Sequence, residues 1–241
     1  MITFDHTSFA VPDAVAAARR VRRELGAVPF AGEAMSEFRW LQLRVGDNGQ
    51  SVELLDPAGP GFLSRFLDRR GSGPHHVTFL VPDLRAAVAD ARAVGAVVVG
   101  EDYGHPAWRE AFLAPDGVHG LVIQLAETDG SDDYVADWWQ PVTAEEPLRV
   151  ATLGHTHLTT TDPGRSEEIF ASLLGGEQEQ RSDGVRYSWP GGALLVRRGD
   201  VPGITGLTLD QWPGAAPPVT DLLPGVAWTL ADEPGAMDMT R

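Results

Sequence analysis

The feature that most constrains this chain is an internal repeat close to its N-terminus. The segment His6-Thr-Ser-Phe-Ala-Val-Pro-Asp13 matches His76-Val-Thr-Phe-Leu-Val-Pro-Asp83 at an offset of 70 residues. The match continues downstream, where each copy ends in a similar triplet, Val52-Glu53-Leu54 or Ile123-Gln124-Leu125. A duplication of this length means that one supersecondary unit is built twice. The fold must therefore accommodate two related units.

Each copy predicts a strand, then a helix, then further strands. Residues 3–11 and 77–81 are rich in β-branched and aromatic side chains, which favour strands. A Pro-Asp pair then opens an Ala-rich helical stretch in each copy. A glycine, Gly26 or Gly95, follows each stretch and suits the positive φ with which helices commonly end.

The remaining strands follow from turn signals. In the first copy, strands at 38–45 and 50–56 flank Asp47-Asn48-Gly49, where Asn and Gly accept the positive φ of a primed hairpin turn. The connector to the second copy holds a short amphipathic piece at 62–67. The second copy predicts three strands, at 97–100, 109–114 and 121–126. Pro115-Asp116-Gly117 is the turn between the last two.

The character of the chain changes after residue 126. The stretch 127–146 holds seven acidic residues and no basic one, which predicts a linker. Its aromatic residues, Tyr134, Trp138 and Trp139, are expected to dock on a neighbouring surface.

A weaker third copy of the repeat follows this stretch. His155-Thr-His-Leu-Thr-Thr-Thr-Asp162 falls on His6 to Asp13, a helix is predicted at 166–174 with Gly175-Gly176 closing it, and 187–198 predicts a hairpin. The fourth copy is eroded. Strands are expected at 204–210 and 226–230, but 213–224 is too rich in proline for the helix between them.

Composition excludes several kinds of chemistry. All 19 basic residues are Arg and there is no Cys, so thiol nucleophiles, Schiff-base lysines, thiolate metal sites and disulfides are ruled out. The net charge of −15 disfavours nucleic acid and anionic membranes as partners. No signal peptide or membrane-spanning run is recognisable. We therefore expect a cytoplasmic protein with a small-molecule partner.

Four repeated positions carry side chains that bind metals. Because side chains alternate along strands, His6 and Glu53 can both point to the inside of a curved sheet, and His76 and Gln124 take the same places in the second copy. One such His is more often structural than ligating, and the repeat is what raises the odds. Two imidazole nitrogens and two oxygens suit a divalent transition ion with open positions for water or substrate.

Residues 1–128 resemble the vicinal oxygen chelate superfamily, which includes glyoxalase I, extradiol dioxygenases and bleomycin resistance proteins, and most closely its methylmalonyl-CoA epimerase branch. The segments that carry the resemblance are His6 before Phe9-Ala-Val-Pro-Asp13, Val52 to Pro57, Phe62 to Leu67 before Gly71, Gly73 to Phe79, Trp108 to Pro115 and Gly120 to Glu127.

The resemblance implies an α+β fold of paired βαβββ modules that form a cupped eight-stranded mixed sheet. We expect this domain at 1–128, an acidic linker at 129–147 and a degenerate second copy of the fold at 148–241. The resemblance further implies one divalent ion, Co, Mn, Ni, Zn or Fe, held by His6, Glu53, His76 and Gln124. His76 is preferred to His75 because the repeat registers it with His6.

One departure from the family concerns proton transfer. The last ligand is usually Glu, and in the epimerase and glyoxalase branches this carboxylate is thought to take part in proton transfer, but here it is Gln124. An amide can ligate through oxygen but cannot act as a base at neutral pH. The candidate bases are Glu53, Glu37 and Glu110, with His105 and His119 as further options. Trp40, Trp108, Phe112 and His105 are the candidate pocket residues.

Two further departures concern the substrate and the second half. Without Lys and without an obvious Arg cluster at the mouth, a coenzyme A substrate is disfavoured, and Arg19, Arg20, Arg22 and Arg23 are interpreted as a solvated helix face. The second half has no carboxylate at 192–198 and no His at 204–209, so His155 and His157 are interpreted as polar residues at a strand start. We expect this half to cover the first, as a partner subunit would. A monomer and a homodimer both stay open.

The leading hypothesis is a metal-dependent epimerase or isomerase that acts through a metal-stabilised enolate of a small carbonyl or carboxyl substrate. A glyoxalase-type lyase and a ring-cleaving dioxygenase are the enzymatic alternatives. A non-catalytic binding or resistance protein that uses the same cup is the alternative from another class.

Overall fold

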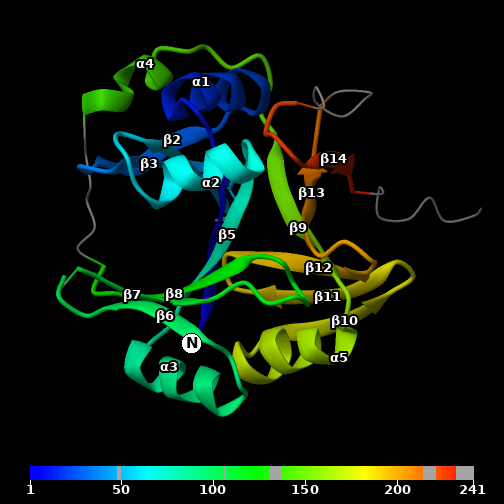
Figure 1. Ribbon diagram of the computed structural model, residues 1–241. Helices are drawn as coiled ribbons and strands as arrows, with labels where there is room; N and C mark the ends of the chain where they lie inside the picture. The colour runs from blue at the N-terminus through cyan, green and yellow to red at the C-terminus, as the bar shows by residue number, and fades with distance from the viewer. Residues whose placement is uncertain (48–49, 106, 131–136, 214–220, 232–241) are drawn as a thin grey trace, which may run out of the picture.

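The structure is a computed structural model that describes residues 1–47, 50–105, 107–130, 137–213 and 221–231. The first half forms one eight-stranded mixed sheet in the order β2-β3-β4-β1-β5-β8-β7-β6 (Figure 1). The first unit consists of β1 Thr3–Ala10, α1 Ala14–Leu25, β2 Val28–Ala34, β3 Phe38–Arg44 and β4 Ser51–Pro57, and α2 Phe62–Arg70 follows it. The second unit consists of β5 Gly73–Leu80, α3 Leu84–Ala93, β6 Val98–Asp102, β7 Trp108–Leu113 and β8 Val122–Thr128.

The two units have the same internal construction, as the repeat predicts. In each, the first strand pairs in parallel with the last, β1 with β4 and β5 with β8, and the two first strands pair antiparallel at the centre. The helices also start alike, because the carboxylates of Asp13 and Asp83 accept hydrogen bonds from the backbone amides of Ala16 and Ala86. The expected paired βαβββ fold is confirmed.

The second half forms a six-stranded sheet in the order β10-β11-β12-β9-β13-β14. Its elements are β9 Thr152–Thr160, α5 Pro163–Ser166, a helical segment Glu167–Leu173, β10 Glu177–Arg181, β11 Gly184–Trp189, β12 Gly192–Arg198, β13 Gly203–Gln211 and β14 Ala227–Leu230. One complete βαβββ unit is followed by two strands of a fourth, so the expected degenerate copy is confirmed. Residues 214–220 of the proline-rich segment lie outside the described residues, and residues 221–224 are not helical.

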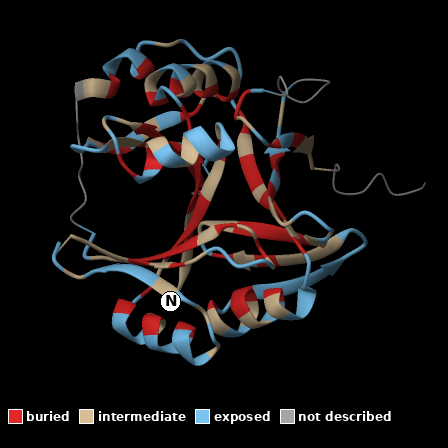
Figure 2. Cartoon of the chain, viewed as in Figure 1, coloured by how far each residue is buried: buried red, intermediate tan, exposed pale blue. Residues whose placement is uncertain are grey.

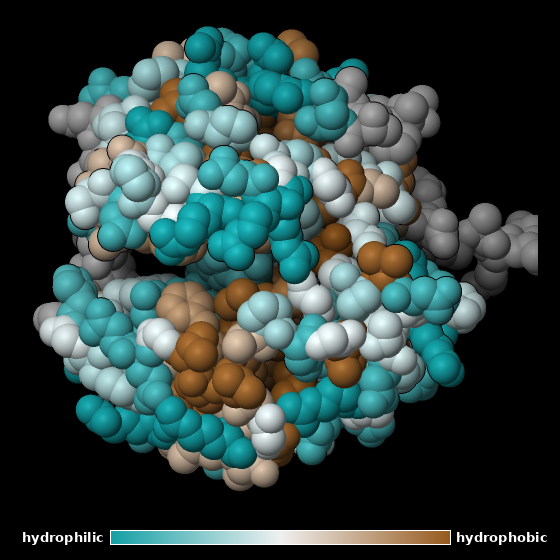
Figure 3. Space-filling view, viewed as in Figure 1, coloured by the Kyte–Doolittle hydropathy of each residue, from teal (hydrophilic) through white to brown (hydrophobic). Residues whose placement is uncertain are grey.

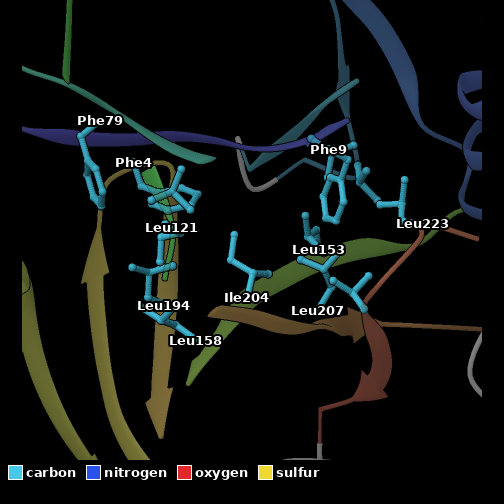
Figure 4. Close-up of a cluster of buried hydrophobic side chains, with 14 of the residues drawn as sticks. Phe4, Phe9, Phe79, Leu121, Leu153, Leu158, Leu194, Ile204, Leu207 and Leu223 are labelled. Carbon is cyan, nitrogen blue, oxygen red and sulfur yellow. The ribbon is translucent and has the colours of Figure 1, made fainter. Parts of the chain in front are cut away.

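The two sheets pack against each other through apolar faces (Figure 4). Phe4, Phe79 and Phe9 from the first sheet lie toward Leu158, Leu194, Ile204 and Leu207 of the second. The ring of Trp189 lies 4.8 Å from that of Phe79 and 6.3 Å from that of Phe4. Burial of these large side chains, red along the central strands in Figure 2, supplies the main driving force for joining the halves.

The centre of this contact reproduces the repeat. The hydroxyls of Thr7 and Thr156, which are equivalent residues of β1 and β9, lie 2.8 Å apart and are fully buried. Thr7 points to one face of β1, and its neighbours His6 and Ser8 point to the other. The second half therefore packs on the face opposite His6. The second half thus covers the first, as expected, through the apolar face of the first sheet.

Two edge strands were not predicted from the sequence. β2 contains Pro29 and Gly32, which disfavour strands. β10 has the sequence Glu-Gln-Glu-Gln-Arg and is exposed along its length, so it lacks the apolar alternation of a packed strand. The strands β3 and β4 pair as the hairpin signal predicts, with Arg44 opposite Ser51. Asn48 and Gly49 of its turn lie outside the described residues.

The acidic stretch docks on the first half. Trp139 is buried against Gly32, and Trp138 lies under the guanidinium of Arg39 at 5.2 Å. The docking of these two tryptophans is confirmed, whereas Tyr134 lies outside the described residues. A 3-10 turn at Asp137–Trp139 and the short helix α4 Gln140–Thr143 bring the chain across α1.

The arginines of α1 are not simply a solvated face. The Nε atoms of Arg19 and Arg22 donate to Glu145, at 2.9 Å to its carboxylate and 2.6 Å to its carbonyl oxygen. Arg23 lies 3.6 Å from the same carboxylate. The acidic stretch is therefore held partly by charge.

No helix among the described residues is long and apolar enough to cross a membrane.

Candidate metal centre

Four side chains meet on the concave side of the first sheet, each from one of its four central strands. Glu53 Oε2 lies 3.4 Å from His6 Nε2 and 3.6 Å from His76 Nε2. Gln124 Oε1 lies 3.1 Å from His76 Nε2. All four residues are at least nine-tenths buried. The strands β1, β4, β5 and β8 thus bring together the four ligands expected from the sequence.

The donor set fits a divalent transition ion. In a tetrahedral or octahedral shell with bonds of about 2.1 Å, neighbouring donor atoms are roughly 3.0 to 3.4 Å apart, and the spacings here are similar. Two imidazoles, a carboxylate and an amide oxygen also suit borderline metals such as Zn, Co or Fe. His6, Glu53 and His76 alone already form a group in which every donor atom lies within 4.8 Å of the others.

His6 is oriented by a carboxylate behind it. Its Nδ1 atom lies 2.5 Å from Asp5 Oδ2 and 3.1 Å from Gln42 Nε2. Burial alone would lower the pKa of His6, but the charges of Glu53 and Asp5 and its hydrogen bonds to them outweigh burial and raise it to about 10. A carboxylate behind a ligating imidazole fixes the ring and makes the other nitrogen a better ligand.

Glu53 is held in its charged form. Burial alone would raise its pKa, but the charge of His6, the hydrogen bond with His6 and a hydrogen bond donated by Ser8 Oγ at 2.6 Å lower it to about 2. Glu53 is therefore a weak base.

His76 is neutral because it is buried. Burial lowers its pKa to about 3 despite the nearby charge of Glu53. Its Nδ1 atom lies 2.8 Å from Nδ1 of His75. Its ring lies 6.5 Å from that of Phe112, edge to face. A neutral imidazole is the form that binds metal.

Gln124 links the centre to a further carboxylate. Its Nε2 donates to Glu110 Oε2 at 2.7 Å, and its Oε1 accepts from Thr78 Oγ1 at 2.6 Å. Glu110 also accepts from the indole nitrogen of Trp108 at 3.0 Å. Burial raises the pKa of Glu110 although both hydrogen bonds oppose the rise. The structure therefore places one of the expected bases directly behind the amide ligand.

The other predicted site residues are scattered. Phe112 and Trp108 lie beside the centre through His76 and Glu110. Trp40 packs with the apolar residues under α2, and His105 is exposed in the loop before β7, where it accepts from the amide of Trp108. Glu37 is exposed between β2 and β3 and faces the start of α2 at Gly61. Among the described residues, no hydrogen bond or ion pair joins Glu37 or His105 to the four candidate ligands.

His119 does not belong to this centre. It is buried between the halves, where its Nε2 lies 2.9 Å from Ser166 Oγ and its Nδ1 lies 3.4 Å from Asp116. Burial lowers its pKa despite Asp116. Its contacts indicate a role in joining the halves rather than a role as a base.

Several contributors were missed in the sequence. Ser8 and Thr78 lie two residues after His6 and His76 and bond to Glu53 and Gln124. The period of two along a strand would have identified both. Asp5 and His75 directly precede the ligands, and strict alternation would have placed them on the opposite face.

The upper and lower parts of the first sheet enclose the centre from two sides. Figure 1 shows β2 to β4 with α1 and α2 above and β6 to β8 with α3 below, and β1 and β5 connect the two layers. In the space-filling view the surface is hollowed between the side chains around α2 and those of the lower strands (Figure 3).

This fold, with a His, Glu, His and Gln centre, defines the class of protein. Residues 5–112 match the family described as the glyoxalase/bleomycin resistance protein/dioxygenase superfamily, and the chain belongs to it. An ethylmalonyl-CoA/methylmalonyl-CoA epimerase of Cereibacter sphaeroides is 30% identical over 131 residues, which are 51% of this chain and 96% of the relative.

Two solved structures extend the comparison. A variant of Streptomyces coelicolor methylmalonyl-CoA epimerase in complex with 2-nitronate-propionyl-CoA is 27% identical, with a TM-score of 0.49 over 54% of this chain and 99% of that chain. A hypothetical protein from Staphylococcus aureus matches 95% of this chain and 98% of its own at a TM-score of 0.62 and 11% identity. The latter likeness shows that both halves together form a known fold.

Proposed function

We propose that this protein is a metal-dependent epimerase or isomerase that removes and returns a proton at the carbon beside a carbonyl or carboxyl group. The observation that carries the proposal is the convergence of His6, Glu53, His76 and Gln124 with the carboxylate of Glu110 next to them. Similarity to an epimerase over the first half supports the same reaction class.

The four ligands would hold one divalent ion. When bound, such an ion acts as a Lewis acid that polarises a substrate carbonyl and offsets the negative charge that develops when the adjacent carbon loses its proton. Asp5 accepts from Nδ1 of His6 and holds its ring, and Thr78 donates to the amide oxygen of Gln124. These contacts keep the donor atoms directed toward one point without rearrangement.

Glu110 is the base that the geometry favours. It lies beside the centre, and burial raises its pKa toward the range in which a carboxylate is an effective base. Glu53 is a weaker base because its pKa is about 2. The indole of Trp108 and the amide of Gln124 direct one oxygen of Glu110 toward the ligands. Glu37 stays a second candidate, for the opposite face of the substrate.

Thioesters of coenzyme A are the first substrates to test. Relatives are named for methylmalonyl-CoA and ethylmalonyl-CoA. The chain also offers cationic groups next to the centre, because α2 carries the exposed Arg65, Arg69 and Arg70, and its Phe66 packs 4.8 Å from the ring of His75. This basic helix weakens the expectation that a coenzyme A substrate is disfavoured.

Proton exchange in deuterium oxide tests the reaction class. The metal-loaded protein should incorporate deuterium at the carbon between the thioester and the carboxyl group of methylmalonyl-CoA and interconvert its epimers. Chelation should abolish both, and added metal should restore them. Turnover of a thiol hemithioacetal or cleavage of a catechol ring instead would favour the lyase or the dioxygenase.

A non-catalytic binding protein is the second candidate, favoured by the amide at Gln124. Such a protein would bind a ligand stoichiometrically after metal removal and would exchange no substrate proton. Isothermal titration of the metal-free protein with methylmalonyl-CoA separates the two.

Whether the chain acts as a monomer or a homodimer stays a prediction, as do its cytoplasmic location and the domain boundaries 1–128, 129–147 and 148–241.

A further inference from the structure

The two ligating histidines are each preceded by a residue that bulges out of the sheet. Along β1, Phe4 pairs with Phe79 and His6 with Thr78, so Asp5 has no partner of its own. Along β5, His76 pairs with Ser8 and Pro74 with Phe9, so His75 is the extra residue. A bulge re-aims the side chain that it carries.

Both bulged side chains turn toward the ligand that follows them. Asp5 Oδ2 lies 2.5 Å from Nδ1 of His6. His75 Nδ1 lies 2.8 Å from Nδ1 of His76. The two pairs are equivalent in the repeat, since Asp5-His6 falls on His75-His76 at the same offset of 70. A bulged residue that contacts the histidine after it therefore occurs twice. In the first unit it carries a carboxylate and in the second an imidazole.

A hydrogen bond between two imidazole nitrogens needs exactly one proton between them. A neutral imidazole carries its single proton on one nitrogen, and the other nitrogen accepts. If Nε2 of His76 is to bind a metal ion, its proton must be on Nδ1, which then donates to Nδ1 of His75. His75 must in turn carry its own proton on Nε2.

We propose that His75 is a positioning residue of the metal centre, whose Nδ1 atom accepts the Nδ1–H of His76 and so keeps Nε2 of His76 free for the metal. The inference rests on the proposed function because it presumes that the four ligands bind a metal.

Helix α2 holds His75 in the required orientation. The ring of Phe66 lies 4.8 Å from that of His75, edge to face, and the ring of Phe62 lies 5.8 Å away. His75 is thus enclosed between His76 and two aromatic side chains of α2. Its ring cannot turn Nδ1 away from His76 without disturbing that packing.

The second half keeps the bulges and has lost the side chains. Along β9 the extra residue is Gly154, which precedes His155. Along β13 there are two, Thr205, which precedes Gly206, and Asp210, which lies beyond Leu209. Neither a glycine nor a threonine beside a glycine can orient an imidazole. The positioning side chains therefore occur only where the ligand set is complete.

Zinc affinity of variants tests the proposal. His75→Phe keeps a ring between α2 and His76 but removes the acceptor, and it should weaken zinc binding by about 10- to 100-fold in competition with a chromophoric chelator. His75→Asn places an acceptor near the position of Nδ1 and should recover most of that affinity. His119→Phe is the matched control, a buried histidine outside the centre, and it should leave zinc affinity unchanged.

The outcomes separate the inference from the proposed function. Wild-type protein that takes up no zinc, cobalt or manganese overturns the proposed function and the inference with it. Normal uptake by the wild type with equal affinity in His75→Phe overturns the inference alone. If His75→Phe does not fold, nitrogen-15 spectra of the zinc-loaded wild type decide. A proton on Nε2 of His75 is the expected result, and a proton on its Nδ1 overturns the proposal.

Discussion

The two sheets of this chain share one framework but carry different side chains on one face. We call the face of the first sheet that bears His6 the first cup, and the equivalent face of the second sheet, which bears His155, the second cup. In the first, Ser8 pairs in register with Glu53 on one neighbouring strand and with His76 on the other. The equivalent residue of the second, His157, pairs with Leu195 and Gly206. An apolar side chain and a glycine thus stand where the first cup has a carboxylate and an imidazole.

The remaining ligand positions differ as well. Thr78 pairs with Gln124 in the first sheet, and the equivalent Thr208 pairs with Thr229 in the second. Only His155, the equivalent of His6, keeps a ligand residue. The comparison teaches that the sheet does not need the ligands to form, because its packing comes from the opposite, apolar face.

A hydrogen-bonded cluster occupies the second cup. His157 Nδ1 lies 3.1 Å from a guanidinium nitrogen of Arg197, which can only donate, so Nδ1 accepts. His157 Nε2 then donates to Thr208 Oγ1 at 2.6 Å, and His155 Nε2 lies 3.1 Å from the same hydroxyl. A guanidinium beside the imidazole and the lack of a carboxylate ligand make this cup unsuited to a metal ion.

The largest expected effect separates the cups by metal content. His76→Ala should lower zinc affinity by more than about 100-fold, because it removes a donor atom. This exceeds the loss of about 10- to 100-fold that follows when a residue in contact with a ligand is changed. His157→Ala should leave zinc content unchanged. Elemental mass spectrometry of both purified proteins measures this, with circular dichroism to verify folding. Zinc lost from His157→Ala but kept by His76→Ala would reverse the assignment of the cups.

The next effect concerns the base. Glu110→Gln should lower the rate of substrate proton exchange by about 10² to 10⁴-fold, the usual contribution of a general base, while zinc is retained. Glu127→Gln offers a matched control on the adjacent strand β8, where Glu127 pairs with Arg109. An exchange rate in Glu110→Gln equal to that of wild type would remove Glu110 from the mechanism.

His6 of the first cup and His157 of the second should respond to pH in opposite directions in the metal-free protein. Burial lowers the pKa of His157 from 6.5 to about 4, with Arg197 adding to the shift. The unfolded chain therefore takes up a proton below pH 6.5 while the folded chain does not, so stability is lost as pH falls from about 6.5 toward 4. The raised pKa of His6 has the opposite sign, with stability present below pH 6.5 and lost as pH rises through about 10.

His157→Gln isolates the acid response. Between pH 8 and pH 5, removing this histidine should reduce the loss of unfolding free energy by about 2 kcal/mol relative to wild type. Urea unfolding of the metal-free proteins at the two pH values measures it. An equal loss in wild type and His157→Gln would show that His157 is not linked to acid stability.

The smallest effect is at the contact between the cups. The buried hydroxyls of Thr7 and Thr156 bond to each other, and a double-mutant cycle of Thr7→Val and Thr156→Val should give a coupling of about 1 kcal/mol. Each single variant leaves one buried hydroxyl without its partner, so the double variant should be more stable than the sum predicts. Additive values would indicate that the halves are joined by apolar packing alone.

The sequence predicted the fold where the repeat was intact. The match of His6 to Asp13 with His76 to Asp83 led directly to the paired strands and helices, and the four ligands could be registered from it. The prediction failed for β10, because an exposed edge strand needs no apolar alternation. Which face of the first sheet the second half covers was not predicted, since that depends on residues distant in the sequence.

The side chains behind the ligands were missed for a related reason. A period of two assigns Asp5 and His75 to the face opposite His6 and His76. The bulges that return them to the ligands are visible only in the pairing of β1 with β5. Glu110 was one of several candidate bases, but its hydrogen bond to Gln124 could be seen only in the structure.

Anomalous diffraction at the zinc edge from crystals of the zinc-loaded protein tests the central claim most directly. We predict a single strong peak per chain, bounded by Nε2 of His6 and His76, Oε2 of Glu53 and Oε1 of Gln124. A peak between His155 and His157 would contradict the account. So would well-ordered density for the four expected ligands with no anomalous peak among them.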